Sequence, residues 1–181
     1  MFMLWAIPIG IVAGLVFGGR VDSLARLRFR WAWLAVGGLL VQVVLFTPLG
    51  NSVVGDDLVP PIYVGSTLAV FVAVLRNVTT PGMAIVALGA LSNLVAIGAN
   101  GGLMPASAGA LALAGFNGPG DHTNSVVLEA PAFETLTDIY ALPAWLPLAN
   151  VFSVGDVLIG LGIAVAIVAA MRQPPIGNGG T

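Results

Sequence analysis

The amino-acid sequence predicts an all-α membrane protein, a polytopic bundle of five transmembrane helices with a long external loop. Hydrophobic residues make up 58% of the chain and charged residues only 8%, whereas a soluble domain carries about 25% charged residues. A hydrocarbon core about 30 Å thick is crossed by about 20 helical residues, and the chain offers five apolar runs near that length. We therefore expect residues 1–171 to form one bundle and residues 172–181 to form a disordered cytoplasmic tail.

The arginines predict how this bundle is oriented. The chain contains no lysine, and its six basic residues lie beside connections on one side: Arg20, Arg26, Arg28, Arg30, Arg76 and Arg172. Seven of the eight acidic residues lie in the opposite connections or in the last apolar run: Asp56, Asp57, Asp121, Glu129, Glu134, Asp138 and Asp156. Because basic residues near short loops mark the cytoplasmic side of a membrane, we expect the N-terminus outside and the C-terminus in the cytoplasm.

The first predicted helix, over residues 2–19, carries a small residue at every fourth position. Gly10, Gly14 and Gly18 would form a flat strip on one face, and such a strip lets a neighbouring helix approach closely. The strip predicts tight packing against another helix, or a protein partner or second copy bound through this helix. The arginine-rich connection over residues 20–30 would then lie in the cytoplasm.

The next three predicted helices cover residues 31–49, 60–75 and 82–99. Trp31 stands at the inner boundary of the first of them, where interface tryptophans collect. Gln42 falls in the middle of the same run. A polar side chain at that depth is expected to face another helix rather than lipid.

The connection over residues 100–149 is the longest in the chain, and the arginine pattern makes it external. Residues 105–116 are apolar but too few to span a membrane, so they predict a re-entrant or interfacial helix. Residues 132–142 predict a second surface helix that ends before a proline. The fifth transmembrane helix is expected over residues 151–171.

Composition excludes several classes of function. The chain has no cysteine and a single histidine, His122. Disulfides, thiolate nucleophiles and sulfur-ligated metals are therefore excluded, and so is a site with several histidine ligands. The sequence predicts no metal and no cofactor. The net charge of −2 argues against a nucleic-acid partner, and membrane lipid is the expected surrounding.

Asp156 is the residue that most directly suggests chemistry. It lies about five residues inside the last predicted helix, and an ionisable residue within a membrane helix is a functional candidate by default. Ser153 stands three residues before it, which also fits a capping box at a helix start. The cap favours a structural role over catalysis, although a capping carboxylate can also serve as a ligand.

A second group of polar and small residues lies around the fourth predicted helix. Ser92 and Asn93 lie in its outer half, and Asn100, Gly101 and Gly102 end it. Asn93 is expected to pair with Asp156, a bond that acts as interhelical glue more often than as a substrate contact. The two glycines expose backbone amides that could hold an anion, but a helix stop and a turn explain them more simply.

Two resemblances follow from these segments. NGGLMP over residues 100–105, together with FSVGDVLIGLGIAV over residues 152–165, resembles a family of uncharacterised bacterial membrane proteins with about five apolar helices. That resemblance covers most of the chain and implies a multi-pass protein of the bacterial cytoplasmic (inner) membrane. It implies no particular activity.

The second resemblance is to lipoprotein signal peptidases and is confined to the last two predicted helices, through LGALSNLVAIGA and NVFSVGDVLIGLGIAV. Those enzymes are aspartyl peptidases whose two catalytic acids lie near the outer membrane face. The resemblance implies that Asn93 matches a family asparagine and Asp156 the second catalytic aspartate. The first catalytic aspartate would fall at Ala96, so a second acid must come from the external loop.

Two functions are therefore expected ahead of a third, a small transporter or carrier for an apolar ligand. The sparse polar inventory and the glycine strip favour a non-enzymatic accessory subunit or a module that binds lipid or another apolar ligand. The alternative is an outer-face hydrolase that pairs Asp156 with a loop acid, for example Asp121, Glu129 or Asp138, because an acid pair needs one carboxyl to hold a proton while the other activates water.

Overall fold

The structure, a computed structural model, describes residues 2–116 and 125–173, and within them the chain is mostly helical. Three short helical turns are present among the described residues: η1 (Phe2–Trp5), η2 (Val21–Arg26) and η3 (Glu134–Leu136). The first two precede the second long helix, and η3 lies in the long connection. The α-helices are α1 (Ala6–Val16), α2 (Ala32–Leu45), α3 (Pro48–Val53), α4 (Val59–Leu75), α5 (Met83–Ala99), α6 (Ala108–Leu113) and α7 (Val154–Met171). The strands are β1 (Met104–Pro105), β2 (Ser125–Val126), β3 (Tyr140–Leu142) and β4 (Asn150–Phe152).

Each of the five predicted apolar runs forms helix, but their lengths differ. Among the described residues, α7 alone is long and apolar enough to cross a membrane by length and composition. Four shorter apolar helices accompany it: Phe2–Val16, Ala32–Leu45, Val59–Leu75 and Met83–Ala99. The run predicted over residues 31–49 is divided because Pro48 begins α3, which Thr47 caps by accepting a hydrogen bond from the Gly50 amide at 3.0 Å.

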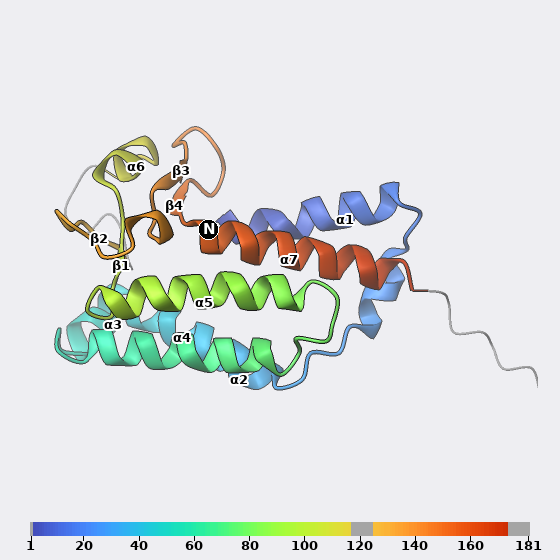
Figure 1. Ribbon diagram of the computed structural model, residues 1–181, viewed down its shortest axis with the longest axis horizontal. Helices are drawn as coiled ribbons and strands as arrows, with labels where there is room; N and C mark the ends of the chain where they lie inside the picture. Colours follow the sequence, from blue (N-terminus) through green and yellow to red (C-terminus); the bar gives the residue numbers. More distant parts are fainter. Residues whose placement is uncertain (1, 117–124, 174–181) are drawn as a thin grey trace, which may run out of the picture.

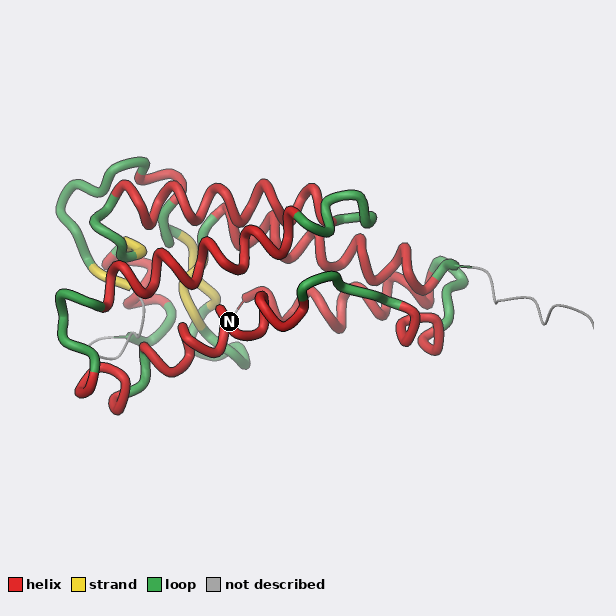
Figure 2. The backbone as a smooth tube through the Cα atoms, turned by 90° about the horizontal axis from the view of Figure 1, so that it is seen from below, coloured by secondary structure: helices red, strands yellow, loops and turns green. Residues whose placement is uncertain are grey.

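The five longer helices pack in the spatial order α1, α7, α5, α4, α2. Figure 1 shows α1 and α7 as one layer and α2, α4 and α5 as another, with α5 packed against α7. In both Figure 1 and the turned view of Figure 2 the helices run roughly side by side along the long axis. Gln42 of α2 donates a hydrogen bond to Thr67 of α4 at 3.3 Å, which confirms that this mid-helix amide faces a neighbouring helix.

The predicted glycine strip lies against α7 of the same chain. A Cβ at Gly10 would stand 3.1 Å from Ala164 and from Ile167, and one at Gly14 would collide with Met171. Gly18 does not belong to the strip: it has a φ of +76° in the turn after α1, and a Cβ there would meet nothing within 4 Å. A partner bound through α1 would therefore have to use another face of the helix.

The long connection folds over one end of the bundle and contains strands, so the prediction of an all-α fold is wrong there. Strands β1 and β2 pair in parallel, β3 and β4 pair antiparallel, and Ala106 forms an isolated parallel bridge with Asp138. The helix predicted over residues 132–142 is replaced by η3 and β3, because β3 takes its backbone hydrogen bonds from β4. The helix predicted over residues 105–116 is reduced to α6, which begins after its cap, Ser107.

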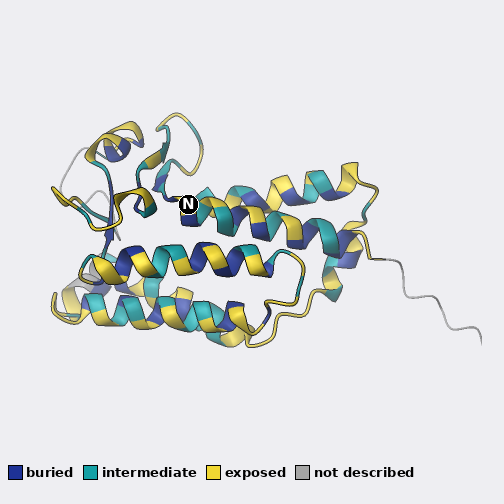
Figure 3. Ribbon diagram, viewed as in Figure 1, coloured by how far each residue is buried: buried dark blue, intermediate teal, exposed yellow. Residues whose placement is uncertain are grey.

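The opposite end of the bundle carries the arginines. Asn77, which follows α4 and is buried, accepts a hydrogen bond from the Arg30 amide at 2.8 Å and donates to the Arg30 carbonyl at 2.7 Å. This pair fastens the connection before α2 to the end of α4. Arg76 lies 6.0 Å from the centre of the Trp31 ring. Figure 3, in which the ribbon is coloured by burial, shows buried residues mainly where the helices face one another and exposed residues on their outer faces.

Candidate functional site

Asp156 lies in the first turn of α7 and completes the predicted capping box. Its backbone amide donates to the Ser153 hydroxyl at 3.1 Å, and its Oδ2 accepts from the Ser153 amide at 3.2 Å. This reciprocal pair satisfies two of the amides that have no partner at the start of a helix. The structural role expected for Asp156 is therefore present.

Asn93 of α5 extends this cap into a network between two helices. Its Nδ2 donates to Asp156 Oδ1 at 2.8 Å, and its Oδ1 accepts from the Ser153 hydroxyl, also at 2.8 Å. Both carboxylate oxygens of Asp156 are thus occupied by donors, and the orientation of the Asn93 amide is set by its two partners. The network closes because Gly155 has no side chain: a Cβ there would collide with Asn93 and with the Gly89 carbonyl.

Asp138 is brought to this end of α7 by the folded connection. Its amide donates to the Pro105 carbonyl at 3.0 Å, and its own carbonyl accepts from the Ser107 amide at 3.1 Å. These two bonds tie its backbone to the segment that leaves α5. The residue is only 5% exposed. Its Oδ2 accepts a weak hydrogen bond from Ser125 at 3.3 Å, and its buried Oδ1 has no partner among the described residues.

The two carboxyl groups are close enough to interact, and we refer to Asp138 and Asp156 as the acid pair. Burial, and then the negative charge of Asp156, raise the pKa of Asp138 to about 7, while the hydrogen bond from Ser125 lowers it. A carboxyl group with this pKa holds its proton in a large part of the molecules at neutral pH. The site therefore combines one carboxyl that retains a proton with a second carboxyl, Asp156, whose two oxygens accept hydrogen bonds from the Asn93 side chain and the Ser153 amide.

Asn100 holds part of the long connection against the end of α5. Its side chain accepts from the Ala132 amide at 2.8 Å and donates to the Ala132 carbonyl at 2.9 Å, and it also donates to the Ala96 carbonyl at 2.8 Å. It thus fastens the segment that precedes η3 to the end of α5. The structure places Asn100 in this clamp rather than in the network of Asn93 and Asp156.

The remaining predicted site residues have separate positions. Gly101 and Gly102 have φ values of +73° and +84°, as a helix stop followed by a turn requires. A Cβ at Gly102 would stand 2.6 Å from Pro60, so this turn also packs on the start of α4. The hydroxyl of Ser92 is buried without a partner among the described residues, and no hydrogen bond joins it to the network.

An aromatic stack next to Ser153 was not predicted from the sequence. The rings of Phe2 and Phe152 stack at 4.2 Å between centroids, and Tyr140 stacks on Phe152 at 5.6 Å. The stack joins η1 to the β3–β4 pair beside the start of α7. Its members lie far apart in the sequence and follow no period, so no sequence signal marked them.

The other loop acids do not join the acid pair. Glu129 and Glu134 are exposed, and Asp121, like His122, lies outside the described residues. Within residues 2–116 and 125–173, no group of three or more histidines, cysteines or acids is placed to hold a metal ion. Asp138 is therefore the loop acid that the described structure brings to Asp156.

Over the described residues, these features define a mostly helical protein with one helix of membrane-spanning length and a pair of carboxyl groups, one of them buried, beside the start of that helix. The chain belongs to a family of unknown function (DUF5317), whose model matches residues 26–168. That range contains the acid pair, Asn93 and Ser153. No curated protein and no solved structure matches the chain. Membership of an uncharacterised family is thus confirmed, while the comparisons return no signal peptidase.

Proposed function

We propose that the five longer helices cross the bacterial cytoplasmic membrane, with the arginines in the cytoplasm and the acid pair at the outer face. Large apolar side chains on the outer faces of several helices support this placement, for example Val16, Trp33 and Leu88, which are 76%, 73% and 58% exposed. Water would not favour so much exposed apolar surface on one small domain. The separation of arginines from the acid pair supports the orientation.

Within this frame, we propose that the acid pair hydrolyses an amide or ester bond of a substrate that reaches the outer membrane face. The observation that carries the proposal is the convergence of Asp138 and Asp156 from separate segments, with Asp138 Oδ1 buried and unpartnered among the described residues. In a two-carboxyl mechanism, one group must supply a proton while the other takes one from water.

In the proposed mechanism each carboxyl has a different role. Asp156, oriented by Asn93 and Ser153, takes a proton from the attacking water as its oxygen bonds to the carbonyl carbon. Asp138 gives its proton to the carbonyl oxygen, so the intermediate is neutral. When the bond to the leaving group breaks, Asp156 gives its proton to the departing nitrogen or oxygen, and Asp138 recovers its proton as the carbonyl re-forms.

The non-enzymatic role that composition favoured, an accessory subunit or a lipid-binding module, accounts for the exposed apolar faces but not for the acid pair. A purely structural hydrogen-bonded contact between the helices needs only Asn93, Ser153 and Asp156. It gives no reason for a second carboxyl group to be buried beside the first, where burial and like charge make ionisation costly. The hydrolase therefore explains one more feature than the accessory role does.

The test uses the full chain purified in lipid nanodiscs, with a panel of quenched fluorogenic peptides and fluorogenic ester lipids. Asp156→Asn and Asp138→Asn should each lower hydrolysis at least about a hundred-fold, the range expected when a general acid or base is lost. Glu129→Gln, which alters an exposed loop acid, should leave the rate unchanged. Equal rates in the parent protein and both aspartate variants would refute the proposal.

A peptide that contains a statine hydroxyl provides a second readout, because that hydroxyl mimics the tetrahedral intermediate between two carboxyl groups. The parent protein should bind it more tightly than the matching peptide without the hydroxyl. Both asparagine variants should lose this preference while remaining folded. A preference that persists in the variants would count against the acid pair as the binding site.

A further inference from the structure

A groove runs between α1 and α7 at the arginine-bearing end of the bundle, away from the acid pair. Its volume is about 520 Å³, within the range of about 300–1,000 Å³ typical of small-molecule sites. One residue of α1, the residue that follows α1, and five from α7 and its C-terminal end line it: Ala13, Phe17, Ala164, Val165, Val168, Ala169 and Arg172. The walls are apolar apart from Arg172.

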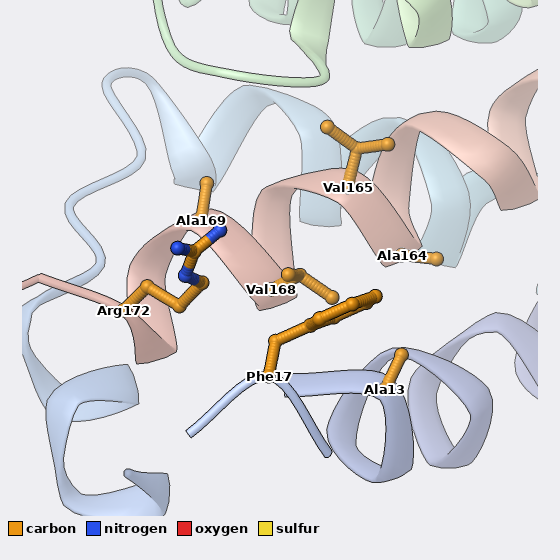
Figure 4. A pocket seen from close by; sticks show the side chains of 7 residues that line it. All are labelled: Ala13, Phe17, Ala164, Val165, Val168, Ala169 and Arg172. Carbon is orange, nitrogen blue, oxygen red and sulfur yellow. The ribbon is translucent and has the colours of Figure 1, made fainter. Parts of the chain in front are cut away.

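The two ends of the groove differ in chemistry. Figure 4 shows the Phe17 ring lying between Ala13 of α1 and Val168 of α7, while the Arg172 side chain folds back along α7 toward Ala169. Alanines on both helices leave room that larger side chains would fill. A ligand that fits must therefore have an apolar part for the Phe17 end and a negative group for Arg172.

Among the described residues, the nearby charged side chains do not neutralise Arg172. Arg20, which also lies at this end and whose amide donates to the Met171 carbonyl at 2.9 Å, is paired with Asp22 at 2.7 Å. Asp22 is the one acid in the arginine-bearing connections of the chain. The guanidinium of Arg172 has no acidic partner among the described residues. The end of the groove thus carries a positive charge that the described part of the chain does not neutralise.

We propose that the groove binds an anionic phospholipid of the inner leaflet, with an acyl chain against Phe17 and the phosphate at Arg172. Charge complementarity selects the ligand: cationic residues at the cytoplasmic interface attract anionic headgroups, and the adjoining apolar walls accept a chain that a free phosphate lacks. This inference rests on the proposed membrane placement and does not depend on the acid pair. Arg172 lies sixteen residues beyond Asp156, about 24 Å along a helix.

The full chain is extracted in mild detergent and titrated with phosphatidylglycerol or phosphatidylcholine. Native mass spectrometry then measures which lipid stays bound. The parent protein should retain phosphatidylglycerol preferentially. Arg172→Gln should lower that preference about five-fold, the factor that one interfacial arginine contributes. Arg28→Gln, which removes a charge from the same side but not from the groove, should change it less than about two-fold, because it leaves the phosphate contact at Arg172 in place.

A second variant tests the apolar part of the site. Ala13→Leu places a larger side chain in the groove without disturbing helix propensity, and it should lower retention of both lipids. Val12→Leu, on a 60% exposed position of the same helix, is the matched control. Equal losses from Arg172→Gln and Arg28→Gln, or unchanged retention in Ala13→Leu, would overturn the proposal. Lipid retention is measured without any substrate, so failure here is distinguishable from failure of the proposed hydrolysis.

Discussion

Asn93 of α5 and Asp156 of α7 are joined by a hydrogen bond of 2.8 Å, and the same asparagine accepts a bond of equal length from Ser153. The Asn93 side chain therefore contacts both members of the α7 capping box, the Ser153 hydroxyl and the Asp156 carboxyl group. This arrangement couples the stability of the α5–α7 contact to the orientation of Asp156. Substitutions in and around this network separate the two effects.

Replacing Asn93 tests the network as a structural contact. Asn93→Ala removes two hydrogen bonds and leaves the Ser153 hydroxyl and one Asp156 oxygen without these partners. We expect the free energy of unfolding in lipid to fall by about 1–3 kcal/mol, measured by denaturant titration. Ser92→Ala is the matched control: its hydroxyl is buried without a partner among the described residues, so its removal should cost much less. Equal losses in both variants would contradict the network.

The close approach of α5 and α7 depends on Gly155. In Gly155→Ala, the new methyl group collides with Asn93 and the Gly89 carbonyl, so we expect a loss of about 1–3 kcal/mol from overpacking. Gly98→Ala on α5 is the control, since a Cβ at Gly98 meets nothing within 4 Å. The control should gain about 0.5–1 kcal/mol because alanine favours helix over glycine. Thermal unfolding of the two variants in one detergent measures the contrast.

The pKa of Asp138 predicts a pH dependence of stability. Burial and Asp156 raise that pKa from 3.8 to about 7, so between these values the folded state binds more protons than the unfolded state. The free energy of unfolding should therefore be highest near or below pH 4 and fall as the pH rises to about 7, by at most about 1.4 kcal/mol per pH unit from this group.

Asp138→Asn isolates this effect because the amide keeps the shape of the carboxyl without its charge. The variant should unfold with a flatter pH profile between pH 4 and 7, and above pH 7 it should be more stable than the parent protein. Glu129→Gln, an exposed loop position, should keep the parent's profile. Measurements of unfolding at pH 4.5, 6 and 8 test the prediction, and identical slopes in parent and Asp138→Asn would exclude it.

If the acid pair is catalytic, the same ionisation controls the rate. Hydrolysis requires the protonated form of Asp138, so kcat/KM should decrease as the pH rises through about 7, with a limiting slope of one decade per pH unit. The measurement is a pH–rate profile with the most rapidly cleaved fluorogenic substrate. A rate that increases through the same interval would assign the proton to a different group.

Asn100 is expected to act as a positioning residue for the segment that carries Asp138. Asn100→Ala removes the two hydrogen bonds to Ala132, and we expect faster amide hydrogen exchange over residues 132–138 with little change in α7. If the site is a hydrolase, the variant should also lower kcat. Exchange that increases equally across the bundle would instead indicate general destabilisation rather than a local clamp.

Helix positions were predictable from the sequence because each depends on local composition. The apolar runs, the Ser153–Asp156 cap and the turn at Gly101 and Gly102 all follow from neighbouring residues. The division of the second run at Pro48 and the absence of a helix over residues 132–142 were missed. The division at Pro48 depends on one capping residue, Thr47. The strand that replaces the helix over residues 132–142 depends on pairing with β4, which lies outside that segment.

By itself, the sequence determined that the chain is mostly helical, where its long helices lie, and that its arginines are separated from most of its acids. It also marked Asp156 and Asn93 as partners. Tertiary structure alone decided that Asp138, and neither Glu129 nor Glu134, joins Asp156, and that the glycine strip of α1 packs on α7. The physical reason is that helix formation and capping depend on residues within about one turn, whereas the approach of two carboxyl groups from separate segments depends on how the intervening chain folds.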